Sequence, residues 1–263
     1  MKLKIALGQI NVREGDLDSN LAKANRFCGE GSKRVADLLL LPELWLNGFL
    51  LDQAYELAQC DDGPYFDRIR QLAETHKIAI SGSVMRKTSE GKVRNSSFIQ
   101  YADGQHSAFY DKLHLFEPML EQTYLERGDR PVILNTQWGK IGLAICYDLR
   151  FPELFRHYAA QGVEIVLLSA QWPLPRIMHW KTLLRARAIE NQMYIAACNR
   201  VGDIGTYRFF GASRVIGPTG KILLEMGDEE GLEVVEIDLA LVEEVRNSMK
   251  VLDDIRTDKF PQS

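Results

Sequence analysis

The stretch from residue 142 to residue 153 constrains the fold more than any other part of the sequence. It reads Gly-Leu-Ala-Ile-Cys-Tyr-Asp-Leu-Arg-Phe-Pro-Glu, and its apolar start predicts a short buried strand. Pro152 suits the first turn of a helix, so a strand and a helix must meet within a few residues. Cys146 lies on this bend, where its side chain leaves the packing of the strand and free amide N–H groups follow it. The position favours a nucleophile, although a cysteine taken alone is more often a small buried hydrophobe.

The first half of the chain alternates predicted strands and helices. We expect strands at residues 2–10, 35–41, 78–84, 97–101 and 107–110, and helices from Asp18 to Gly29 or Gly31 and over residues 64–76. The polar residues 86–94 and the pair Asp103-Gly104 indicate hairpin turns, and residues 44–49 form a turn-rich segment with exposed aromatic side chains. Residues 111–128 have no sustained period, and long segments of this kind inside a compact domain are usually functional or mobile.

The second half repeats this order of elements without a clear repeat of residues. We expect strands at residues 132–136, 140–145, 163–168, 193–199, 213–216, 221–224 and 233–237, and helices at 152–161, 177–191 and 239–247. Residues 202–210 are predicted to be a loop, and a tail follows from about Asp253. Two such halves with interleaved hairpins indicate an α/β fold in which two mixed sheets pack face to face under outer helices. We treat residues 1–263 as a single domain.

Charge and cysteine usage limit the classes of partner. The net charge is −4 and the acids and bases are interspersed, so no footprint for nucleic acid or an anionic membrane is present. The most apolar stretch is far too short to span a bilayer, and the first residues lead into a strand rather than a signal segment. The four cysteines lack the spacing of a zinc site or a disulfide framework, which favours the reducing cytoplasm. A small molecule is the expected partner.

Three polar residues follow predicted strands in a way that fits covalent catalysis. Glu43 comes just after an apolar strand, Lys112 follows residues 107–110, and Cys146 follows residues 140–145. Ligands of open α/β sheets bind beyond the carboxyl ends of strands. A thiol needs a base to become a thiolate, and attack on an amide needs a cation or donor for the oxyanion. A solvent-facing glutamate at a strand end is also common, so Glu43 alone does not decide between these interpretations.

The segments around these three residues resemble the signatures of the nitrilase (carbon-nitrogen hydrolase) superfamily. They read Leu-Pro-Glu43, Asp-Lys112-Leu-His-Leu-Phe and Ile-Cys146-Tyr-Asp-Leu-Arg-Phe-Pro-Glu, and the resemblance covers essentially the whole chain. It implies a four-layer αββα sandwich and a Glu-Lys-Cys catalytic triad that needs no metal or organic cofactor. It also implies a second buried glutamate that orients the lysine. Glu121 is the expected residue, with Glu117 and Glu126 as weaker candidates.

The omega-amidase branch of this superfamily is the most similar, through Ala170-Gln-Trp-Pro-Leu-Pro-Arg and Arg187-Ala-Ile-Glu-Asn-Gln. This resemblance implies a short dicarboxylic monoamide as substrate, such as 2-oxoglutaramate or succinamate, and a homodimer formed through helices 152–161 and 177–191. Arginine matches a carboxylate bidentately, so we expect substrate contacts from Arg150 and Arg176, beside Trp172. An ion pair of Arg150 with a neighbouring acid is an equal alternative. The remaining expected substrate contacts are the Tyr147 N–H, at the oxyanion, and His114, at the mouth of the site.

Other chemistries remain open at this point. A papain-like cysteine-histidine pair would use His114, His157 or His179 as base, although the sequence suggests no Asn or Asp to orient it. A nitrilase or an N-carbamoyl amidase is the alternative within the superfamily, and assays with nitriles and carbamoyl amines discriminate between them. A non-catalytic binding protein on the same fold is a further alternative, which a thiol-reactivity assay tests.

Overall fold

The computed structural model describes residues 1–256, which contain two six-stranded mixed sheets and a two-stranded hairpin. The strands are β1 Lys2–Gln9, β2 Leu38–Leu40, β3 Ala79–Lys87, β4 Val93–Gln100, β5 Tyr110–Asp111, β6 Ile133–Thr136, β7 Gly139–Ile145, β8 Ile165–Ala170, β9 Tyr194–Asn199, β10 Val201–Ile204, β11 Tyr207–Phe210, β12 Arg214–Ile216, β13 Ile222–Glu225 and β14 Gly231–Asp238. The helices are α1 Leu17–Lys33, α2 Ala54–Leu57, α3 Pro64–His76, α4 Glu121–Tyr124, α5 Pro152–Ala160, α6 Ile177–Asn191 and α7 Ala240–Ser248. Short 3-10 turns lie at Leu51–Gln53, Glu117–Met119, Cys146–Arg150 and Leu174–Arg176. The part of the predicted tail that follows Arg256 lies outside the described residues.

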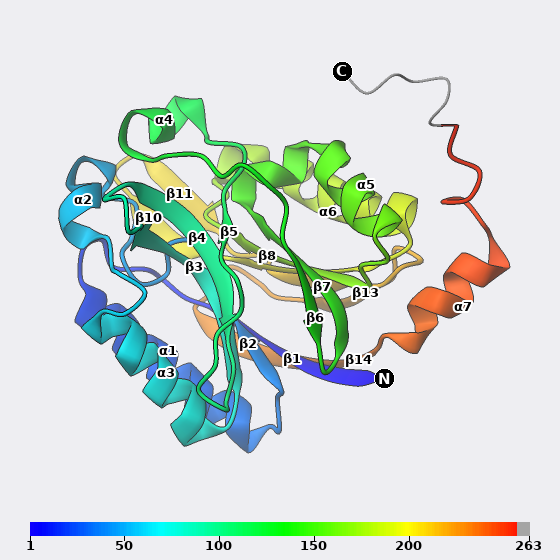
Figure 1. Cartoon of the computed structure of the whole chain (residues 1–263), viewed down its shortest axis with the longest axis horizontal. Helices are drawn as coiled ribbons and strands as arrows, with labels where there is room; N and C mark the ends of the chain where they lie inside the picture. The colour runs from blue at the N-terminus through cyan, green and yellow to red at the C-terminus, as the bar shows by residue number, and fades with distance from the viewer. Residues whose placement is uncertain (257–263) are drawn as a thin grey trace.

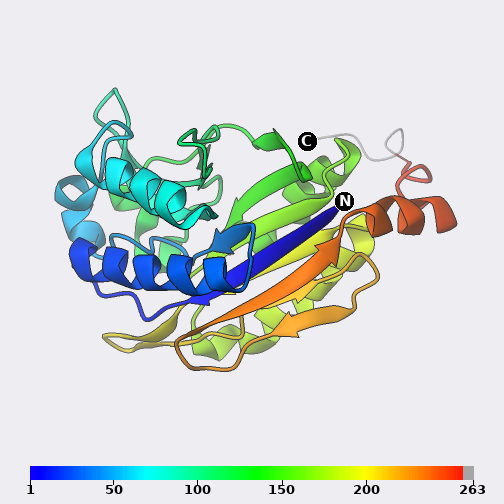
Figure 2. The ribbon, with the colours of Figure 1, turned by 90° about the horizontal axis from the view of Figure 1, so that it is seen from below.

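The two sheets pack against each other and helices cover their outer faces (Figure 1). One sheet has the strand order β14-β1-β2-β3-β4-β5, and the other has the order β13-β12-β9-β8-β7-β6. Helices α1 and α3 lie side by side on the outer face of the first sheet, and α5 and α6 lie together on the second (Figures 1 and 2). The predicted four-layer αββα sandwich is therefore confirmed.

Burial on both faces explains why some strands are apolar throughout rather than alternating. Strand β2 consists of three leucines, all fully buried, and it lies between the parallel strands β1 and β3. The main core joins Ile5 and Leu7 of the first sheet to Leu143 and Leu167 of the second. Within residues 1–256, no helix has both the length and the apolar composition needed to cross a bilayer.

Strand direction brings the ends of several strands to one edge of the sandwich. Strands β1, β2 and β3 are parallel in the first sheet, and β7, β8 and β9 are parallel in the second. Strand β5 runs in the direction of β3, because each is antiparallel to β4. The two sheets are joined at this edge by a hydrogen bond from Ser169 Oγ to the Leu41 carbonyl oxygen, 2.8 Å long. Residues that follow β2, β5, β7 and β8 therefore meet there.

Several predicted segments differ from the structure. Residues 202–210 are not a loop but belong to the hairpin β10–β11, in which Val201 pairs with Phe210. The turn predicted over residues 86–94 is shorter, because β3 and β4 continue until the Thr88 N–H donates to the Lys92 carbonyl. The strand predicted from residue 35 begins only at Leu38, because Val35 has a φ of +58° and is exposed.

The turn-rich segment 44–49 was also expected to expose its aromatic side chains, and for Trp45 this is wrong. Trp45 is buried, with 1% of its surface exposed. Gly82 provides the space, because a Cβ there would lie 2.5 Å from the Trp45 ring. The bulk of the indole ring therefore packs onto β3 instead of facing solvent.

Candidate active site

Cys146 stands at the junction between β7 and the 3-10 turn Cys146–Arg150. Its φ is +42°, in the left-handed region that residues other than glycine seldom adopt. Strained backbone of this kind persists where the surrounding structure fixes it, and such residues cluster at functional sites. The structure therefore contains the sharp bend that the sequence predicts, with the Cys146 side chain 9% exposed.

Glu43 is buried at the end of β2, and protein donors hold both of its carboxylate oxygens. Oε1 accepts hydrogen bonds from Lys112 Nζ at 2.7 Å and from Asn95 Nδ2 at 2.8 Å. Oε2 accepts the backbone N–H of Gln171 at 3.0 Å. The Gln171 side chain also donates from Nε2 to the Glu43 carbonyl at 2.7 Å. This glutamate does not face solvent, so the interpretation as a solvated strand end is wrong.

Lys112 lies between two buried carboxylates. Its Nζ is 2.7 Å from Glu43 Oε1 and 2.7 Å from Glu121 Oε1. Glu121 is fully buried at the start of α4, and its Oε2 accepts the backbone N–H of Phe116 at 2.7 Å. Glu121 rather than Glu126 is thus the second glutamate at the lysine, since Glu126 instead pairs with Lys92.

The charges of this cluster control its protonation. Burial alone would lower the pKa of Lys112, but the carboxylates of Glu121 and Glu43 outweigh burial and raise it. Burial raises the pKa of Glu121 to about 6, against the opposing effect of Lys112. Burial and the charge of Glu43 raise the pKa of the Cys146 thiol well above its ordinary value, and Lys112 opposes them. These directions favour a neutral thiol beside a charged lysine.

This arrangement has the parts needed for nucleophilic attack on a carbonyl group. A buried carboxylate is available to accept the thiol proton, and a buried ammonium is available to stabilise an oxyanion. Both groups act electrostatically on the Cys146 sulfur. The described residues contain no group of three or more His, Cys, Asp and Glu side chains arranged to hold a metal ion.

A cavity opens beside Cys146 and carries two arginines. Its lining residues are Phe116, Cys146, Tyr147, Arg150, Gln171, Trp172, Pro173 and Arg176. The Arg150 guanidinium lies 4.8 Å from the Trp172 ring centroid, and its Nη2 is 3.2 Å from His179 Nδ1. The Arg176 guanidinium lies 5.7 Å from the Phe116 ring centroid. Within residues 1–256 neither arginine pairs with a carboxylate, so the alternative ion pair of Arg150 with Asp148 or Glu153 is absent.

His114 does not line this cavity. Its Nδ1 is 2.7 Å from Asp148 Oδ1, and its ring stacks on Phe151 with the centroids 3.6 Å apart. We expected no Asn or Asp beside this histidine from the sequence, and this expectation is wrong, because Asp148 contacts Nδ1. The other candidate bases differ: His179 contacts Arg150, and His157 lies on α5 against the Tyr158 ring.

The sequence profile of the carbon-nitrogen hydrolase family matches residues 4–247. The chain belongs to the carbon-nitrogen hydrolase family. This carbon-nitrogen hydrolase is 42% identical over 262 residues to the 2-oxoglutaramate amidase of Bacillus subtilis (strain 168), an alignment that covers 99% of this chain and 100% of the relative. The family membership that the three motifs indicate is therefore confirmed.

Two solved structures of related proteins share the fold of this hydrolase. A CN-hydrolase superfamily protein from Xanthomonas campestris, with an arsenic adduct in its active site, has a TM-score of 0.91 and 32% identity, and 97% of each chain is covered. A mutant of the amidase from Nesterenkonia sp. AN1 carries the acetamide moiety of fluoroacetamide on its active-site cysteine. Its TM-score is 0.87 at 29% identity, with 98% of this chain and 95% of that chain covered.

Three polar residues around the cluster of this carbon-nitrogen hydrolase were not predicted from the sequence. Asn95 and Gln171 hold Glu43, and Asp148 holds His114. Asn95 lies inside a strand, where nothing in the sequence marks it as different from its neighbours. Asp148 and Gln171 both lie within motifs that the sequence analysis identified, and their position beside predicted site residues was the available signal.

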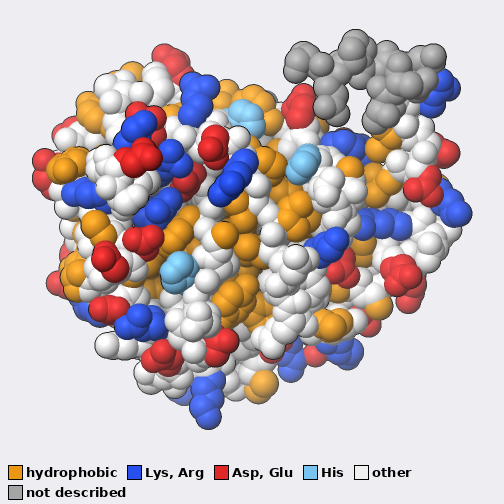
Figure 3. All heavy atoms as spheres, in the orientation of Figure 1, with side chains coloured by type: hydrophobic (Ala, Val, Ile, Leu, Met, Phe, Trp, Pro, Cys, Tyr) orange, Lys and Arg blue, Asp and Glu red, His pale blue; other side chains and the backbone are white. Residues whose placement is uncertain are grey.

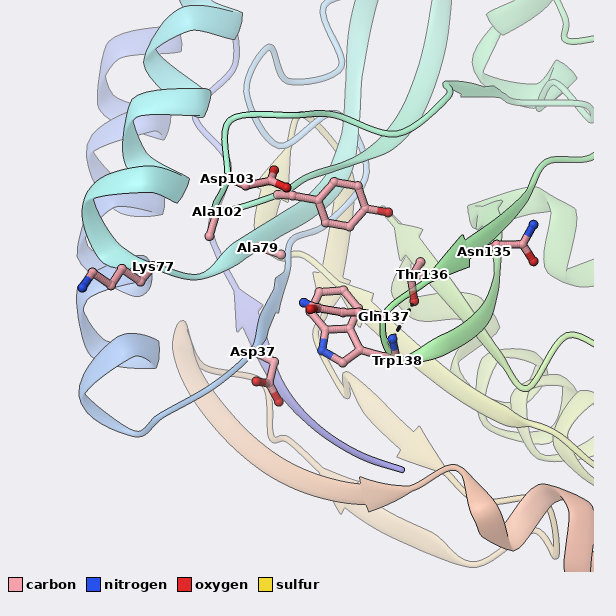
Figure 4. Close-up of a pocket in the computed structure, with 10 residues that line it drawn as sticks. Asp37, Lys77, Ala79, Ala102, Asp103, Asn135, Thr136, Gln137 and Trp138 are labelled. Carbon is pink, nitrogen blue, oxygen red and sulfur yellow. Dashed lines mark hydrogen bonds between the residues drawn. The ribbon is translucent and has the colours of Figure 1, made fainter.

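The opposite end of the hydrolase contains a wider hollow of about 460 Å³ (Figure 4). Asp37 precedes β2 and Lys77 precedes β3, and both residues line this hollow. The hollow therefore lies at the amino ends of these strands, whereas the cluster around Lys112 lies beyond the carboxyl ends. Trp138 and Tyr101 form its aromatic wall, with ring centroids 6.2 Å apart. No lining residue is a cysteine, serine or histidine.

The face shown in Figure 3 mixes acidic and basic side chains, as the even spread of charge predicts.

Proposed function

We propose that this carbon-nitrogen hydrolase is a cysteine-dependent amidase that converts a small omega-amide to the acid and ammonia through a thioester intermediate. The observation that carries the proposal is the buried, hydrogen-bonded group of Glu43, Lys112 and Glu121 beside the Cys146 thiol. The relative named 2-oxoglutaramate amidase supports an amide substrate. The related amidase with an acetamide moiety on its active-site cysteine supports covalent chemistry at sulfur.

Acylation begins when Glu43 accepts the proton of the Cys146 thiol and the resulting thiolate attacks the amide carbon. The carbonyl oxygen becomes an oxyanion, which the Lys112 ammonium and the Tyr147 N–H stabilise. The carbon–nitrogen bond then breaks, and Glu43 passes its proton to the departing nitrogen, so that ammonia leaves. Glu121 keeps Lys112 charged and oriented, because an ammonium buried without an anion tends to lose its proton.

Deacylation uses the same base. Glu43 accepts a proton from water, and the water oxygen attacks the thioester carbon. The carbon–sulfur bond breaks as Glu43 returns the proton to the Cys146 sulfur, and the carboxylic acid leaves. The starting protonation state is then restored, and protein groups alone perform every step.

The substrate we propose is a short monoamide with a carboxylate at its other end, such as 2-oxoglutaramate or succinamate. Arg150 and Arg176 place two positive charges on the wall of the cavity, and no acid of residues 1–256 neutralises either of them. A carboxylate would pair with such a guanidinium through two parallel hydrogen bonds. A nitrilase for apolar nitriles would instead bring an uncharged group against these cations and gain nothing from them.

We further propose that the enzyme works as a homodimer in the cytoplasm. Helix α6 exposes Met178 at 68% and Ile189 at 48% of their surfaces, which supports contact with a second copy through α5 and α6. The four cysteines are all unpaired, which supports a reducing compartment.

Ammonia release from a panel of compounds tests the proposed function. The panel contains succinamate, 2-oxoglutaramate, butyramide, butyronitrile and an N-carbamoyl amine, with the Cys146→Ala protein as the blank. We expect release from the amides, with the two carboxylate-bearing compounds preferred. Release confined to the nitrile or to the carbamoyl amine would replace the amidase by one of those activities. No release from any compound, combined with an unreactive Cys146, would favour a binding protein.

A further inference from the structure

Asp148 is a buried carboxylate that the proposed reaction leaves unused. Its side chain is 0% exposed, in the 3-10 turn that begins at Cys146. Oδ1 accepts the backbone N–H of His114 at 3.1 Å and lies 2.7 Å from His114 Nδ1. Oδ2 accepts the hydroxyl of Tyr110 at 2.7 Å and the backbone N–H of Ile145 at 2.9 Å. Each oxygen thus has two partners.

The partners of Asp148 lie on both sides of the two residues that must meet the substrate. Tyr110 is two residues before Lys112, and His114 is two residues after it. Ile145 directly precedes Cys146, and Asp148 itself is two residues past it. The lysine follows a strand of one sheet and the cysteine follows a strand of the other. A single carboxylate therefore joins the backbone around the lysine to the backbone around the nucleophile.

The surroundings make this connection rigid. A buried carboxylate is stable only with donors on its oxygens, so removing one donor disturbs the others. The bond to the Ile145 N–H holds the backbone just before the strained φ of Cys146. The His114 ring cannot turn freely, because it lies flat on Phe151 with an angle of 7° between the planes.

We infer that Asp148 and His114 are positioning residues that fix the Lys112 ammonium relative to the Cys146 sulfur. The inference rests on the proposed function, in which both groups act on one amide carbonyl. A misplacement of about 1 Å between reacting groups costs roughly 100-fold in rate, so this connection bears on kcat more than on KM. His114 acts through Asp148 and not as a papain-like base, because its ring lies outside the lining of the cavity that holds Cys146.

Two substitutions of His114 test this role. His114→Asn keeps a side-chain N–H near the position of Nδ1, His114→Leu removes it, and both lose the stacking on Phe151. We expect His114→Leu to lower kcat roughly 10-fold or more with little change in KM, and His114→Asn to recover most of the wild-type kcat. His76→Leu is the matched control at a histidine that contacts Asn25 instead, and it should keep wild-type kinetics.

Tyr110→Phe removes a different donor to Asp148 while it preserves the ring, and it should also lower kcat selectively. The rate of alkylation of Cys146 by iodoacetamide, measured in a Cys60→Ser background, should rank the variants in the same order as kcat does. This measurement does not require the substrate to be known. Equal losses in His114→Asn and His114→Leu would show that the hydrogen bond to Asp148 does not carry the effect, and would overturn the inference. Unchanged kinetics and alkylation in His114→Leu and Tyr110→Phe would reduce Asp148 to a stabiliser of the fold. Failure of the proposed function would look different from either of these outcomes, because the wild type would then hydrolyse no amide. The order of alkylation rates among the variants would still report on the positioning role.

Discussion

Substrate choice gives the sharpest prediction, through Arg176. Its guanidinium lines the cavity beside Cys146 and has no carboxylate partner within residues 1–256. A hydrogen bond to a charged group contributes about 1.5–3 kcal/mol, which corresponds to roughly 10- to 150-fold in kcat/KM. We therefore expect the wild type to prefer succinamate to butyramide by roughly this factor. Arg176→Met should erase the preference by lowering kcat/KM for succinamate alone.

The assay is ammonia release at substrate concentrations below KM, run with both compounds on each variant. Arg176→Lys keeps the charge but loses the fork that matches a carboxylate, so an intermediate preference is expected. Arg185→Met is the matched control, because Arg185 lies on the exposed side of α6 away from the cavity. Equal kcat/KM values for the two compounds in the wild type would refute the reasoning, as would equal losses for both compounds in Arg176→Met.

The cluster around Lys112 yields further predictions. Glu43→Gln removes the base, and Lys112→Met removes the positive charge that stabilises the oxyanion. Each substitution should lower kcat about 100-fold or more in the ammonia assay. Wild-type rates in Glu43→Gln would point to a histidine base. Glu121→Gln should be milder, because Glu43 still holds the ammonium. Burial raises the pKa of Glu121 to about 6, so this acid binds its proton at a higher pH than an ordinary glutamate. The wild-type kcat/KM should fall as the pH is lowered through about 6, and a flat profile there would contradict the orienting role. Iodoacetamide should label Cys146 before the exposed Cys60 despite the raised pKa of the Cys146 thiol, because Glu43 accepts its proton as the sulfur attacks. Peptide mass spectrometry would show the order, and the reverse order would count against an activated thiol.

The elements that the sequence predicts correctly are those with a local signal. Helices α3 Pro64–His76 and α6 Ile177–Asn191 begin and end at the predicted residues, because a proline or a C-terminal cap marks the ends and apolar spacing marks the length. The bend at Cys146 followed from an apolar strand that runs into a proline-led helix. The three motifs each place one polar residue just past a strand, which is why the candidate cluster could be anticipated.

Contacts between distant segments could not be predicted in this way. Asn95 reaches Glu43 across 52 positions of the chain, and Gln171 reaches it across 128. Which residues face each other there depends on the pairing of β3 with β4 and on the packing of the two sheets. The hairpin β10–β11 was missed for a different reason, because Phe209 and Phe210 are both buried and hide the alternation that marks a strand.

The central claim is that Cys146 forms the thioester, and turnover in Cys146→Ala tests it most directly. The substitution removes only the sulfur from a side chain that is 9% exposed, so the protein should fold normally, which circular dichroism and thermal unfolding would check. Cys60→Ala, at an exposed thiol that does not line the cavity beside Cys146, is the matched control and should keep full activity. We predict essentially no ammonia release from succinamate by folded Cys146→Ala. Substantial release by that variant would contradict the assignment of Cys146 as nucleophile.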